Sequence, residues 1–404
     1  MKKDIPLLFT TRVIRMFGYG FLSVVLALYL AQRGLSEAEI GLLLTLTLAG
    51  DAAVTLWITT SADRMGRRRM LVFGAGLMIM AGVVFSLTGN FILLVVTAII
   101  GVISPSGNEI GPFLSIEQAA LSQLLPDEKR TQIFAWYNLV GSFATATGAL
   151  VGGGLAQLLQ GAGYSPLNSY RAVLLGYTLI GVVLGDLFLL LSQAVEAPRL
   201  AEVVSIQSKF GLHKSRRVVL KLSSLFAIDA FAGGLVVQSM VAYWFNMKFG
   251  VQPAVLGSIF FGANILAGVS ALSAAWIAKR IGLIHTMVFT HIPSNILLIL
   301  VPLMPTLPLA ILVFLLRFSI SQMDVPTRQS YTMAVVSPDE RSAAMGVTSI
   351  ARSVGATLSP AITGQLLAVP SLIGAPFLIA GSLKIVYDLL VWRGFRALRP
   401  PEEV

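Results

Sequence analysis

The sequence alternates long apolar runs with short polar connections, and one of these connections is unusually rich in arginine. Apolar runs of about 20 residues match the roughly 30 Å hydrocarbon core of a bilayer. Residues 63–69, Asp-Arg-Met-Gly-Arg-Arg-Arg, lie between two such runs, 38–62 and 70–87. A turn with this much positive charge cannot lie in lipid, and by the positive-inside bias it faces the cytoplasm.

The composition indicates an integral membrane protein and excludes several kinds of chemistry. Of the 404 residues, 56% are hydrophobic and only 12% are charged, whereas a soluble domain has about 25% charged residues. The absence of cysteine excludes disulfides, thiol catalysis and cysteine-based metal sites. The three histidines are dispersed, so we expect no metal and no cofactor. The net charge of +10 follows from basic cytoplasmic loops, and we expect no nucleic-acid partner.

The apolar runs predict about twelve membrane spans. In order, they are residues 5–31, 38–62, 70–87, 91–123, 131–160, 170–193, 219–247, 253–278, 284–303, 307–336, 340–369 and 372–393. An even number of spans places both termini and the long basic connection, residues 194–218, on one side. The lysines and arginines outside the spans lie on that side, except Arg33, Arg171 and Lys248. We therefore expect a multi-pass protein of the cell (inner) membrane with both termini in the cytoplasm.

The two halves of the chain repeat each other. At one constant offset, residues 34–36, Gly41 and residues 63–66 align with residues 250–252, Gly257 and residues 279–282. Residues 118–130 align with residues 329–341 to within one position. Two parallel six-span halves are one of the repeat plans of secondary transporters. The sequence predicts an N-terminal six-helix bundle at 1–193, a basic cytoplasmic linker at 194–218 and a C-terminal six-helix bundle at 219–404.

The connection after the second span resembles the loop 2–3 motif of the major facilitator superfamily. Residues 63–68, Asp-Arg-Met-Gly-Arg-Arg, are similar to the second part of that motif, and residues 279–282, Lys-Arg-Ile-Gly, are similar to its weaker copy after the eighth span. The resemblance covers the whole chain. It implies an all-α integral membrane protein with twelve transmembrane helices in two pseudo-symmetric six-helix bundles, and a central cavity lined by spans 1, 4, 7 and 10.

The resemblance also implies a gate near the cytoplasmic ends of spans 2 and 4. In the family, an acid at the cytoplasmic end of span 4 pairs with arginines of loop 2–3, and the aspartate of the motif faces the start of span 11. The corresponding residues of this chain are Asp63, Arg64, Gly66, Arg67, Arg68 and Glu117. The alternative is that the arginines only orient the chain in the membrane.

Three carboxylates deep in the spans are candidates for proton coupling. Ionisable groups at membrane depth are costly and are functional candidates by default. Glu109 lies in a stretch of span 4, residues 104–112, whose prolines and glycines predict a broken helix that lines a cavity. A desolvated carboxyl in such a place binds a proton readily. Asp51 in span 2 and Asp229 in span 7 are the other two candidates.

Polar side chains in spans 1, 4, 10 and 11 are candidates for substrate binding. They are Arg15, Tyr19, Asn108, Arg317, Asp324 and Arg352. Because guanidinium binds an anionic group through two hydrogen bonds, the arginines favour an acidic or zwitterionic solute. The alternative is that these charges pair with one another: Asp229 with Arg15 or Arg352, Asp324 with Arg328, and Lys384 with Asp388, four residues away on the same helix.

The sequence predicts a transporter rather than an enzyme or a receptor. We expect a proton-coupled secondary active transporter that moves a small organic solute by alternating access, as a monomer in the lipid bilayer. The glycines of residues 148–153 resemble the antiporter motif of drug exporters and favour export, although close helix packing also explains them. The alternatives are a proton-independent uniporter and a receptor with a transport fold. Neither a metalloprotease motif nor a nucleophile–base pair indicates an enzyme.

Overall fold

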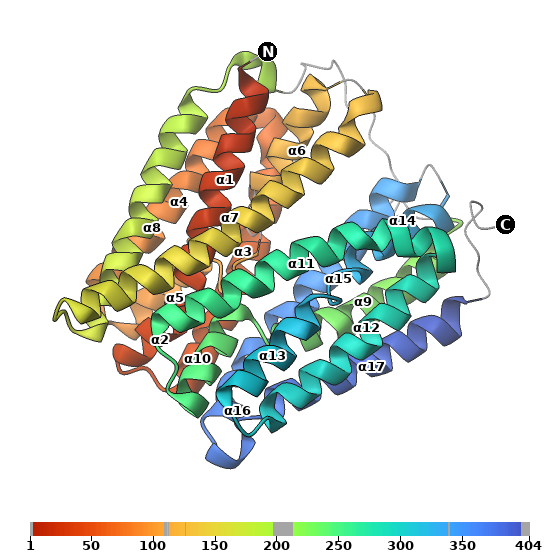
Figure 1. Cartoon of the computed structure of the whole chain (residues 1–404). Helices are drawn as coiled ribbons and strands as arrows, with labels where there is room; N and C mark the ends of the chain where they lie inside the picture. The colour runs from red at the N-terminus through yellow and green to blue at the C-terminus, as the bar shows by residue number, and fades with distance from the viewer. Residues whose placement is uncertain are drawn as a thin grey trace. The chain divides into compact units, whose positions relative to one another are not determined.

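The computed structural model describes residues 3–108, 111, 113–125, 127–196, 213–337 and 340–396. Within these ranges, the regular elements are all helices, as the sequence predicts (Figure 1). They fall into two units. The first contains the residues up to Leu200 together with Val237–Asn264, and the second contains Ala201–Val236 and the residues from Ile265 onward. The division of the chain by a linker at 194–218 stays a prediction.

Each unit is a bundle of helices. The first contains α1 (Asp4–Ser23), α2 (Leu26–Gln32), α3 (Glu37–Met65), α4 (Arg67–Leu87), α5 (Phe91–Ile100), α6 (Phe113–Leu124), α7 (Asp127–Gly161), α8 (Pro166–Leu189), the 3-10 helix η1 (Gln193–Val195), α10 (Gln238–Phe249) and the first part of α11 (Pro253–Ile281). The second contains the rest of α11, α9 (Arg216–Gly234), α12 (Leu283–Leu300), η3 (Val301–Leu303), α13 (Leu307–Phe318), α14 (Asp324–Val335), α15 (Arg341–Thr357), α16 (Ser359–Leu367), η5 (Pro370–Leu372) and α17 (Ala375–Phe395).

These helices account for the predicted spans. Among the described residues, eight helical segments are long and apolar enough to cross a bilayer, and the pair α1 and α2, bent by 41°, makes a ninth. The shorter apolar helices α5 and α13 are followed by α6 and α14, and each pair lies within one predicted span. The helices α15 and α16 divide another span. Every predicted span therefore corresponds to one helix or to two consecutive helices.

Two helix starts show how the sequence sets the boundaries. Ser36 Oγ accepts the N–H of Glu39, and the Glu39 carboxylate accepts the N–H of Ser36 at 2.8 Å. This capping box satisfies N–H groups that have no partner inside the helix. At the start of α8, Ser165 Oγ accepts the N–H of Asn168, and Pro166 occupies the first turn, where its missing N–H costs nothing.

The predicted break in span 4 is confirmed. The helix α5 ends at Ile100 and α6 begins at Phe113, and the described residues between them are not helical. Gly107 and Gly111 have φ angles of 67° and 79°, in the left-handed region that only glycine adopts without a steric penalty. Backbone groups in this break have no partner within a helix and can be hydrogen-bonded by side chains instead. For example, Ser104 Oγ donates to the carbonyl of residue 108 at 2.8 Å.

The internal repeat of the sequence is also present in the backbone. Gly34 and Gly250 hold equivalent places in the two halves, within two residues of the ends of α2 and α10, with φ angles of 86° and 65°. Gly66 separates α3 from α4 with φ of 101°, and its equivalent Gly282 separates α11 from α12 with φ of 84°. Positive φ requires glycine, so both halves keep the same turns for the same steric reason.

Close helix packing repeats in the two units as well. The helix α1 packs along α7 and α4 along α8, while α9 packs along α15 and α12 along α17. A Cβ atom at Gly148 would lie 2.1 Å from the carbonyl oxygen of Phe17, and one at Gly355 would lie 2.3 Å from that of Ala227. No side chain fits at such distances, so these helices contact one another through their backbones. Close packing of the span 5 glycines is confirmed.

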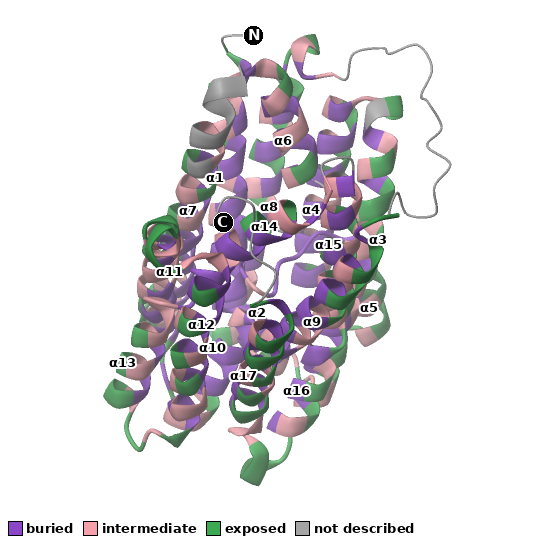
Figure 2. Ribbon diagram, turned by 90° about the vertical axis from the view of Figure 1, so that its right-hand side faces the viewer, coloured by how far each residue is buried: buried purple, intermediate pink, exposed green. Residues whose placement is uncertain are grey.

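The exposed faces of the helices are apolar, which suits lipid and not water. Ile92, Leu158 and Leu179 have exposed fractions of 70%, 73% and 64%. Figure 2 shows exposed residues along many of the helices beside buried faces. In contrast, several charged side chains, such as Arg15, Glu117 and Asp229, are buried. This inversion of the usual pattern is expected of helices in a bilayer, where charges face the protein interior.

Candidate functional site

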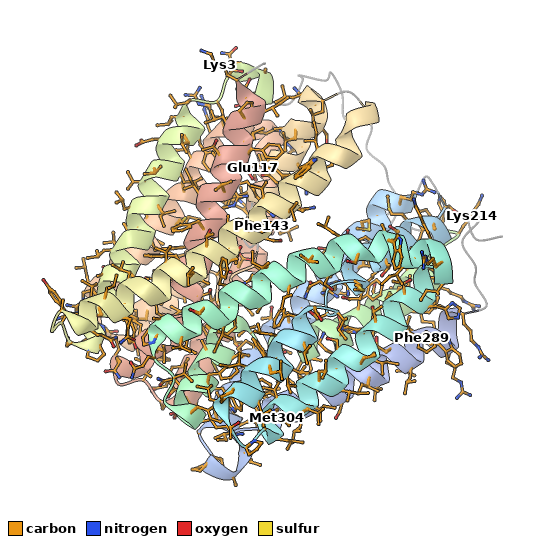
Figure 3. All side chains as sticks on the ribbon, viewed as in Figure 1. Lys3, Glu117, Phe143, Lys214, Phe289 and Met304 are labelled. Carbon is orange, nitrogen blue, oxygen red and sulfur yellow. The ribbon has the colours of Figure 1, made fainter. Side chains whose placement is uncertain are left out.

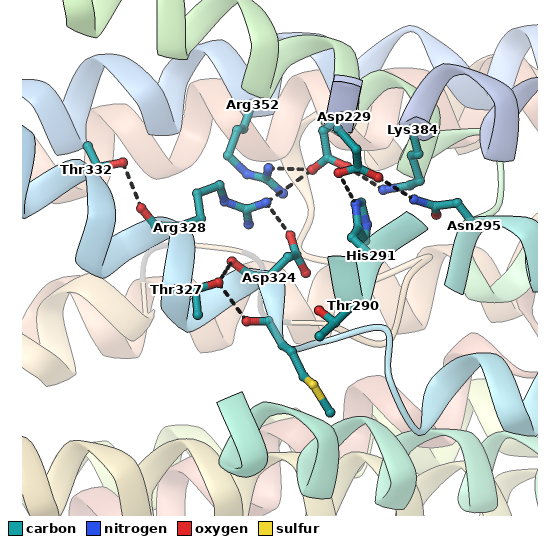
Figure 4. A network of polar contacts seen from close by, with 12 residues as sticks. Asp229, Thr290, His291, Asn295, Asp324, Thr327, Arg328, Thr332, Arg352 and Lys384 are labelled. Carbon is teal, nitrogen blue, oxygen red and sulfur yellow. Dashed lines mark hydrogen bonds and ion pairs between the residues drawn. The ribbon is translucent and has the colours of Figure 1, made fainter. Parts of the chain in front are cut away.

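Charged side chains from four helices of the second unit meet at Asp229 (Figure 4). On α9, Asp229 Oδ1 accepts a hydrogen bond from Lys384 Nζ of α17 at 2.5 Å. Its Oδ2 accepts from Arg352 Nη1 of α15 at 2.8 Å and from Arg328 Nη1 of α14 at 3.2 Å. Arg328 Nη1 also donates to Asp324 Oδ2 on the same helix at 2.7 Å. We term these five residues the Asp229 network.

A buried imidazole and carboxylate lie beside this network. His291 Nδ1 of α12 is 2.8 Å from Asp388 Oδ1 of α17. Asn295 Nδ2, one turn along α12, donates to the other carboxylate oxygen, Oδ2, at 3.2 Å. Asp388 lies one turn from Lys384 on α17, and Figure 4 shows His291 and Asn295 on the Lys384 side of Asp229. The pair is therefore joined to the Asp229 network through α17.

The Asp229 network is buried except at one member. The side-chain exposure is 3% for Asp229 and 7% for Arg328, but 33% for Arg352. Charges removed from water are stable only when they are paired and hydrogen-bonded. The network supplies such pairs, and Arg352 is the member whose side chain is the most exposed of these three.

In the first unit, a second buried cluster surrounds Glu117 of α6, whose position is labelled in Figure 3. Its Oε1 accepts from Arg15 Nη1 at 2.7 Å, and its Oε2 accepts from Arg15 Nη2 at 2.6 Å. Thr11 Oγ1 donates to Oε1 at 2.9 Å, and the Tyr137 hydroxyl donates to Oε2. The side chains of Arg15 and Glu117 are both fully buried. We term these four residues the Glu117 cluster.

In the Glu117 cluster, Arg15, a predicted substrate ligand, is hydrogen-bonded to Glu117, a predicted gate residue. The resemblance to the family implied that Glu117 pairs with arginines of loop 2–3, but its oxygens are bonded by residues of α1 and α7. Both terminal nitrogens of Arg15 bind Glu117, so an anionic ligand at Arg15 would compete with that carboxylate. Tyr19, predicted on the same face of α1, is also fully buried.

The arginines of loop 2–3 contact the segment that follows α8. The backbone N–H groups of Arg67 and Arg68 donate to the carboxylate of Glu196 at 2.6 Å and 3.3 Å. Arg67 Nη1 donates to Gln123 Oε1 at 3.0 Å, and Arg68 Nη1 donates to the carbonyl of Leu191 at 3.2 Å. A carboxylate at the start of α4 is further stabilised by the helix dipole. The loop is thereby attached to the end of span 6.

The remaining gate candidates have fewer contacts. Gly66 forms the turn between α3 and α4. Arg64 is exposed in the last turn of α3. The side chain of Asp63 lies outside the described part of the chain. A pairing of these residues with Glu117 or with span 11 stays a prediction.

Asp51 is a carboxylate of the first unit with unused hydrogen-bonding capacity. It lies on α3 and is hydrogen-bonded by the backbone N–H of Gly111, in the break of span 4. Its Oδ1 is buried and has no hydrogen-bond partner among the described residues. Asn108 is exposed in the same break, and Glu109 lies outside the described residues. Asp51 thus lies where the backbone of span 4 leaves the helical conformation.

The predicted residues of span 10 differ in their contacts. Arg317 of α13 is half-buried, its Nε has no hydrogen-bond partner in the described ranges, and its guanidinium carbon lies 4.8 Å from the centre of the Phe318 ring. Asp324 and Arg328 form the ion pair that their spacing of four residues predicts. The alternative prediction that Asp229 binds Arg352 is also confirmed.

Sequence reasoning missed the pair of His291 and Asp388. It predicted that Lys384 pairs with Asp388 because the two lie four residues apart on one helix. That prediction is wrong, since Lys384 binds Asp229 and Asp388 contacts His291. The available signal was the presence of charges within apolar spans. This signal marks a residue as a candidate, but it does not identify a partner on another helix.

The chain resembles other membrane proteins over different lengths. It is 33% identical over 418 residues to an uncharacterised membrane protein of Saccharomyces cerevisiae, covering 96% of this chain and 93% of the yeast protein. Over 158 residues, or 39% of each protein, it is 22% identical to the quinolone resistance protein NorA of Staphylococcus aureus.

Solved transporter structures share the fold. A bacterial homologue of the human lysosomal transporter Spinster, in an inward-facing and occupied conformation, has a TM-score of 0.74 at 16% identity, over 98% of this chain and 97% of that one. A D-xylose–proton symporter has a TM-score of 0.76 at 15% identity, over 96% of this chain and 97% of that one. At these identities, the likeness concerns the fold alone.

The family assignment follows from the sequence match. The sequence model of the Major Facilitator Superfamily matches residues 8–360 and residues 248–404. The matched region includes the loop 2–3 motif and its copy after the eighth span, so the resemblance noted from the motif is confirmed. The fold is accordingly the all-α fold of twelve transmembrane helices in two bundles, and the protein is a multi-pass membrane transporter rather than an enzyme. The chain belongs to the Major Facilitator Superfamily.

Proposed function

We propose that this protein is a secondary active transporter that moves a small organic solute by alternating access and couples this movement to protons. Family membership supports solute transport. The observation that carries the finer proposal is the Asp229 network, in which one buried carboxylate is shared by three cations. Such a shared carboxylate can release one partner while it keeps the others, and charges at membrane depth are retained where ions or substrates bind.

Arg352 supports a substrate with an anionic group. Its Nη1 binds Asp229, and one third of its side chain is exposed. A guanidinium has further N–H groups in one plane, which match a carboxylate or a phosphate. Arg317 offers a second guanidinium, with an Nε that has no hydrogen-bond partner among the described residues. An acidic or zwitterionic solute that binds Arg352 would weaken its bond to Asp229 and change the pairing within the network.

The other predicted substrate ligands stay part of the proposal, but two of them would first have to break an ion pair. Tyr19, Asn108 and Asp324 would contribute polar contacts, and Asp324 would first exchange its bond with Arg328. Arg15 would bind substrate only in a state in which its pair with Glu117 has opened. The gate residues of loop 2–3 would control access without contacting the substrate.

Asp51 and Asp229 are the described carboxylates that we propose for proton coupling, together with Glu109. Asp51 has one buried oxygen, Oδ1, that has no hydrogen-bond partner among the described residues, and a proton on that oxygen would remove an unbalanced buried charge. Asp229 would accept a proton when its cations bind the substrate instead. Proton coupling occurs in this fold, as the name of the D-xylose–proton symporter states.

The membrane orientation and the direction of transport also belong to this proposal. We place the protein in the cell (inner) membrane as a monomer, with both termini and the basic linker in the cytoplasm, because basic residues gather on that side of the predicted spans. The partial similarity to NorA, a resistance protein, favours export. The span 5 glycines add little to this, since their packing against α1 explains them.

A proton-independent uniporter is the second candidate function. The observation that favours it is that each charge of the Asp229 network has an opposite charge within 3.2 Å or less. A network in which every buried charge is paired is stable without any exchange of protons. The substrate alone would then shift the pairing.

The two functions are distinguished by proton flux. Everted vesicles that hold a proton gradient, reported by a pH-sensitive dye, are challenged with organic anions, zwitterions, lipophilic cations and sugars. We expect anions or zwitterions to collapse the gradient in the wild type, and Asp51→Asn and Glu109→Gln to abolish this flux. The matched control is Asp186→Asn on α8, which removes an exposed carboxylate outside both charged clusters. Radiolabelled solute uptake without any change in the gradient would contradict proton coupling and support the uniporter.

A further inference from the structure

We propose that the pair of His291 and Asp388 is a proton-binding site, and that it supplies the coupling proton in the transport cycle. The second part rests on the proposed proton-coupled function. The pair lies in the second unit on α12 and α17, helices to which sequence reasoning gave no role in coupling. His291 has an exposed fraction of 4%, and Asp388 is fully buried.

The geometry gives the imidazole one donor and one acceptor position. With Nδ1 at 2.8 Å from Asp388 Oδ1, a neutral His291 donates its Nδ1–H to the carboxylate. Its Nε2 then carries the lone pair and accepts a proton, which gives an imidazolium that still donates to Asp388. Asn295 Nδ2 holds the second carboxylate oxygen at 3.2 Å. This support keeps the carboxylate oriented in both protonation states.

Among the described residues, Asp388 is the carboxylate of this region that has no hydrogen bond from a lysine or an arginine. Asp229 binds Lys384, Arg352 and Arg328, and Asp324 binds Arg328. In the described part of the chain, the side chains that contact Asp388 are His291 and Asn295, which are a titratable and a neutral group. A buried carboxylate that no cation contacts is costly. His291 is in contact with Asp388 and can place a positive charge there, and it does so only by binding a proton.

The charges that face the pair come from every helix packed around α12. Those helices are α17, α14 and α13, and α9 and α15 join them through the network. The charged and titratable groups are Lys384 and Tyr387 of α17, Asp324 and Arg328 of α14, Arg317 of α13, Asp229 of α9 and Arg352 of α15. With His291 neutral, the four cations Lys384, Arg328, Arg317 and Arg352 exceed the three carboxylates Asp229, Asp324 and Asp388 by one charge. A proton on His291 adds a second excess positive charge to this region.

That excess charge can act on Arg352, the proposed substrate arginine, through Lys384 and Asp229. Lys384, one turn from Asp388 on α17, is 2.5 Å from Asp229 Oδ1, and Arg352 is 2.8 Å from Asp229 Oδ2. When His291 is charged, Asp388 is neutralised locally and attracts Lys384 less. Asp229 then serves as the main partner of Lys384, and Arg352 is released to bind an anion. Proton binding and anion binding would favour each other, since each compensates the charge of the other.

A further polar atom indicates that the site can exchange protons. Asn295 Oδ1 is buried and has no hydrogen-bond partner among the described residues, although Nδ2 of the same amide binds Asp388. Ser294 Oγ, on the neighbouring residue, is likewise buried and without a partner in those residues. Unsatisfied buried polar atoms are rare and commonly mark a place for water or an ion. Next to an imidazole, such atoms can pass a proton.

The protonation state of His291 can be measured directly because the chain has only three histidines. The full-length protein, labelled with 15N-histidine and reconstituted in lipid nanodiscs, is titrated by nuclear magnetic resonance over the range of about pH 5 to 8 in which histidine changes charge. The His291 signal is assigned as the one lost in His291→Gln. We expect it to change from the neutral to the charged form within this range, and Asp388→Asn to move the transition to lower pH because the favourable carboxylate is gone.

The control is His285→Gln, on the same helix α12. His285 is exposed and stacks on Phe289, outside the charged groups. This variant should leave the His291 transition unchanged. A His291 signal that stays in one protonation state across the titration, in the wild type and in Asp388→Asn, would overturn the proton-binding site.

Transport measurements separate this inference from the proposed function. If a solute drives proton flux in vesicles and His291→Gln retains that flux in full, proton coupling stands and the role of His291 in it is refuted. If no solute drives proton flux although His291 titrates, the proton site is supported and the proposed coupling fails. Loss of flux in His291→Gln with retained radiolabelled uptake supports both. Asp388→Asn serves as the second variant if His291→Gln does not fold.

Discussion

At the scale of single residues, the two buried acids Glu117 and Asp229 differ in how their charge is compensated. Glu117 is held by both terminal nitrogens of Arg15 and by two hydroxyl groups. Asp229 is shared by three cations from three helices. A two-pronged bond to one arginine favours a single arrangement. A carboxylate with several cations has alternative arrangements, which suits a site that must change during a cycle.

We predict that Glu117→Gln destabilises the protein strongly. The substitution leaves the Arg15 guanidinium buried without a counter-charge, and breaking a buried ion pair on one side costs about 3–5 kcal/mol. The measurement is thermal unfolding of the purified protein in detergent, with Asp186→Asn as the control at an exposed carboxylate. The double variant Arg15→Met with Glu117→Leu should lose less stability, because no unpaired charge remains. Equal stability of Glu117→Gln and wild type would contradict this assignment.

The sequence predicts which residues are charged at membrane depth, but not which of them meet. The pair of Asp324 and Arg328 was predictable because both lie on one helix four residues apart. The same rule fails for Lys384 and Asp388, which bind residues of other helices. Contacts between helices depend on how the helices are rotated and packed against one another. The spacing of side chains along one helix does not determine this. His291 was missed for this reason.

At the scale of helices, the composition of the spans predicts their length and their breaks. Proline and glycine in residues 104–112 predicted the interruption between α5 and α6. The break within span 1 was not predicted, because residues 24–25 contain no proline and no glycine, whereas the break within span 7 directly follows Gly233 and Gly234.

We predict that Gly148→Ala destabilises the contact between α1 and α7. A Cβ atom there would lie 2.1 Å from a backbone oxygen of Phe17, which cannot move without the helix, and overpacking typically costs about 1–3 kcal/mol. The matched control is Gly154→Ala on the same helix, since a Cβ atom at Gly154 meets nothing within 4 Å. The melting temperatures of both variants test this. If the two alanines have the same effect, the close backbone contact does not limit the packing.

Glu340 attaches the start of α9 to the start of α15, and this attachment should depend on pH. Burial would raise the pKa of Glu340, but hydrogen bonds from the backbone N–H groups of Ser215, His213 and Lys214 outweigh it and lower the pKa to about 2. The distances are 2.8 Å, 3.0 Å and 2.7 Å. A carboxylate with a lowered pKa in the folded state contributes stability above its unfolded pKa, which is near 4.5.

We therefore predict that Glu340→Gln is less stable than wild type at neutral pH and that the difference disappears in acid. Stability from Glu340 is lost as the pH falls from about 4.5 towards 2, because the folded carboxylate then also becomes protonated. The measurement is the melting temperature of both proteins as a function of pH. A difference that stays constant down to pH 2 would show that the hydrogen bonds matter without the charge.

At the scale of the whole molecule, the repeat in the sequence predicts a repeat in structure. Equivalent glycines have positive φ in both halves, and α1 packs on α7 as α9 packs on α15. Each half thus folds by the same rules. Parallel halves with an even number of spans require both termini on one side of the membrane, and the basic residues select the cytoplasm.

This orientation predicts the accessibility of two exposed positions, and the natural absence of cysteine allows a direct test. Ala162, between α7 and α8, should face away from the cytoplasm, whereas Lys214, directly before α9, should face it; both are exposed. In intact cells, a membrane-impermeant maleimide should label Ala162→Cys and spare Lys214→Cys, and after permeabilisation it should label both. The opposite pattern would invert the topology, and with it the side on which loop 2–3 and its arginines lie. Labelling of both positions in intact cells would mean that an even number of spans lies between them, which the positive-inside bias alone does not exclude but the repeat of two six-span halves does.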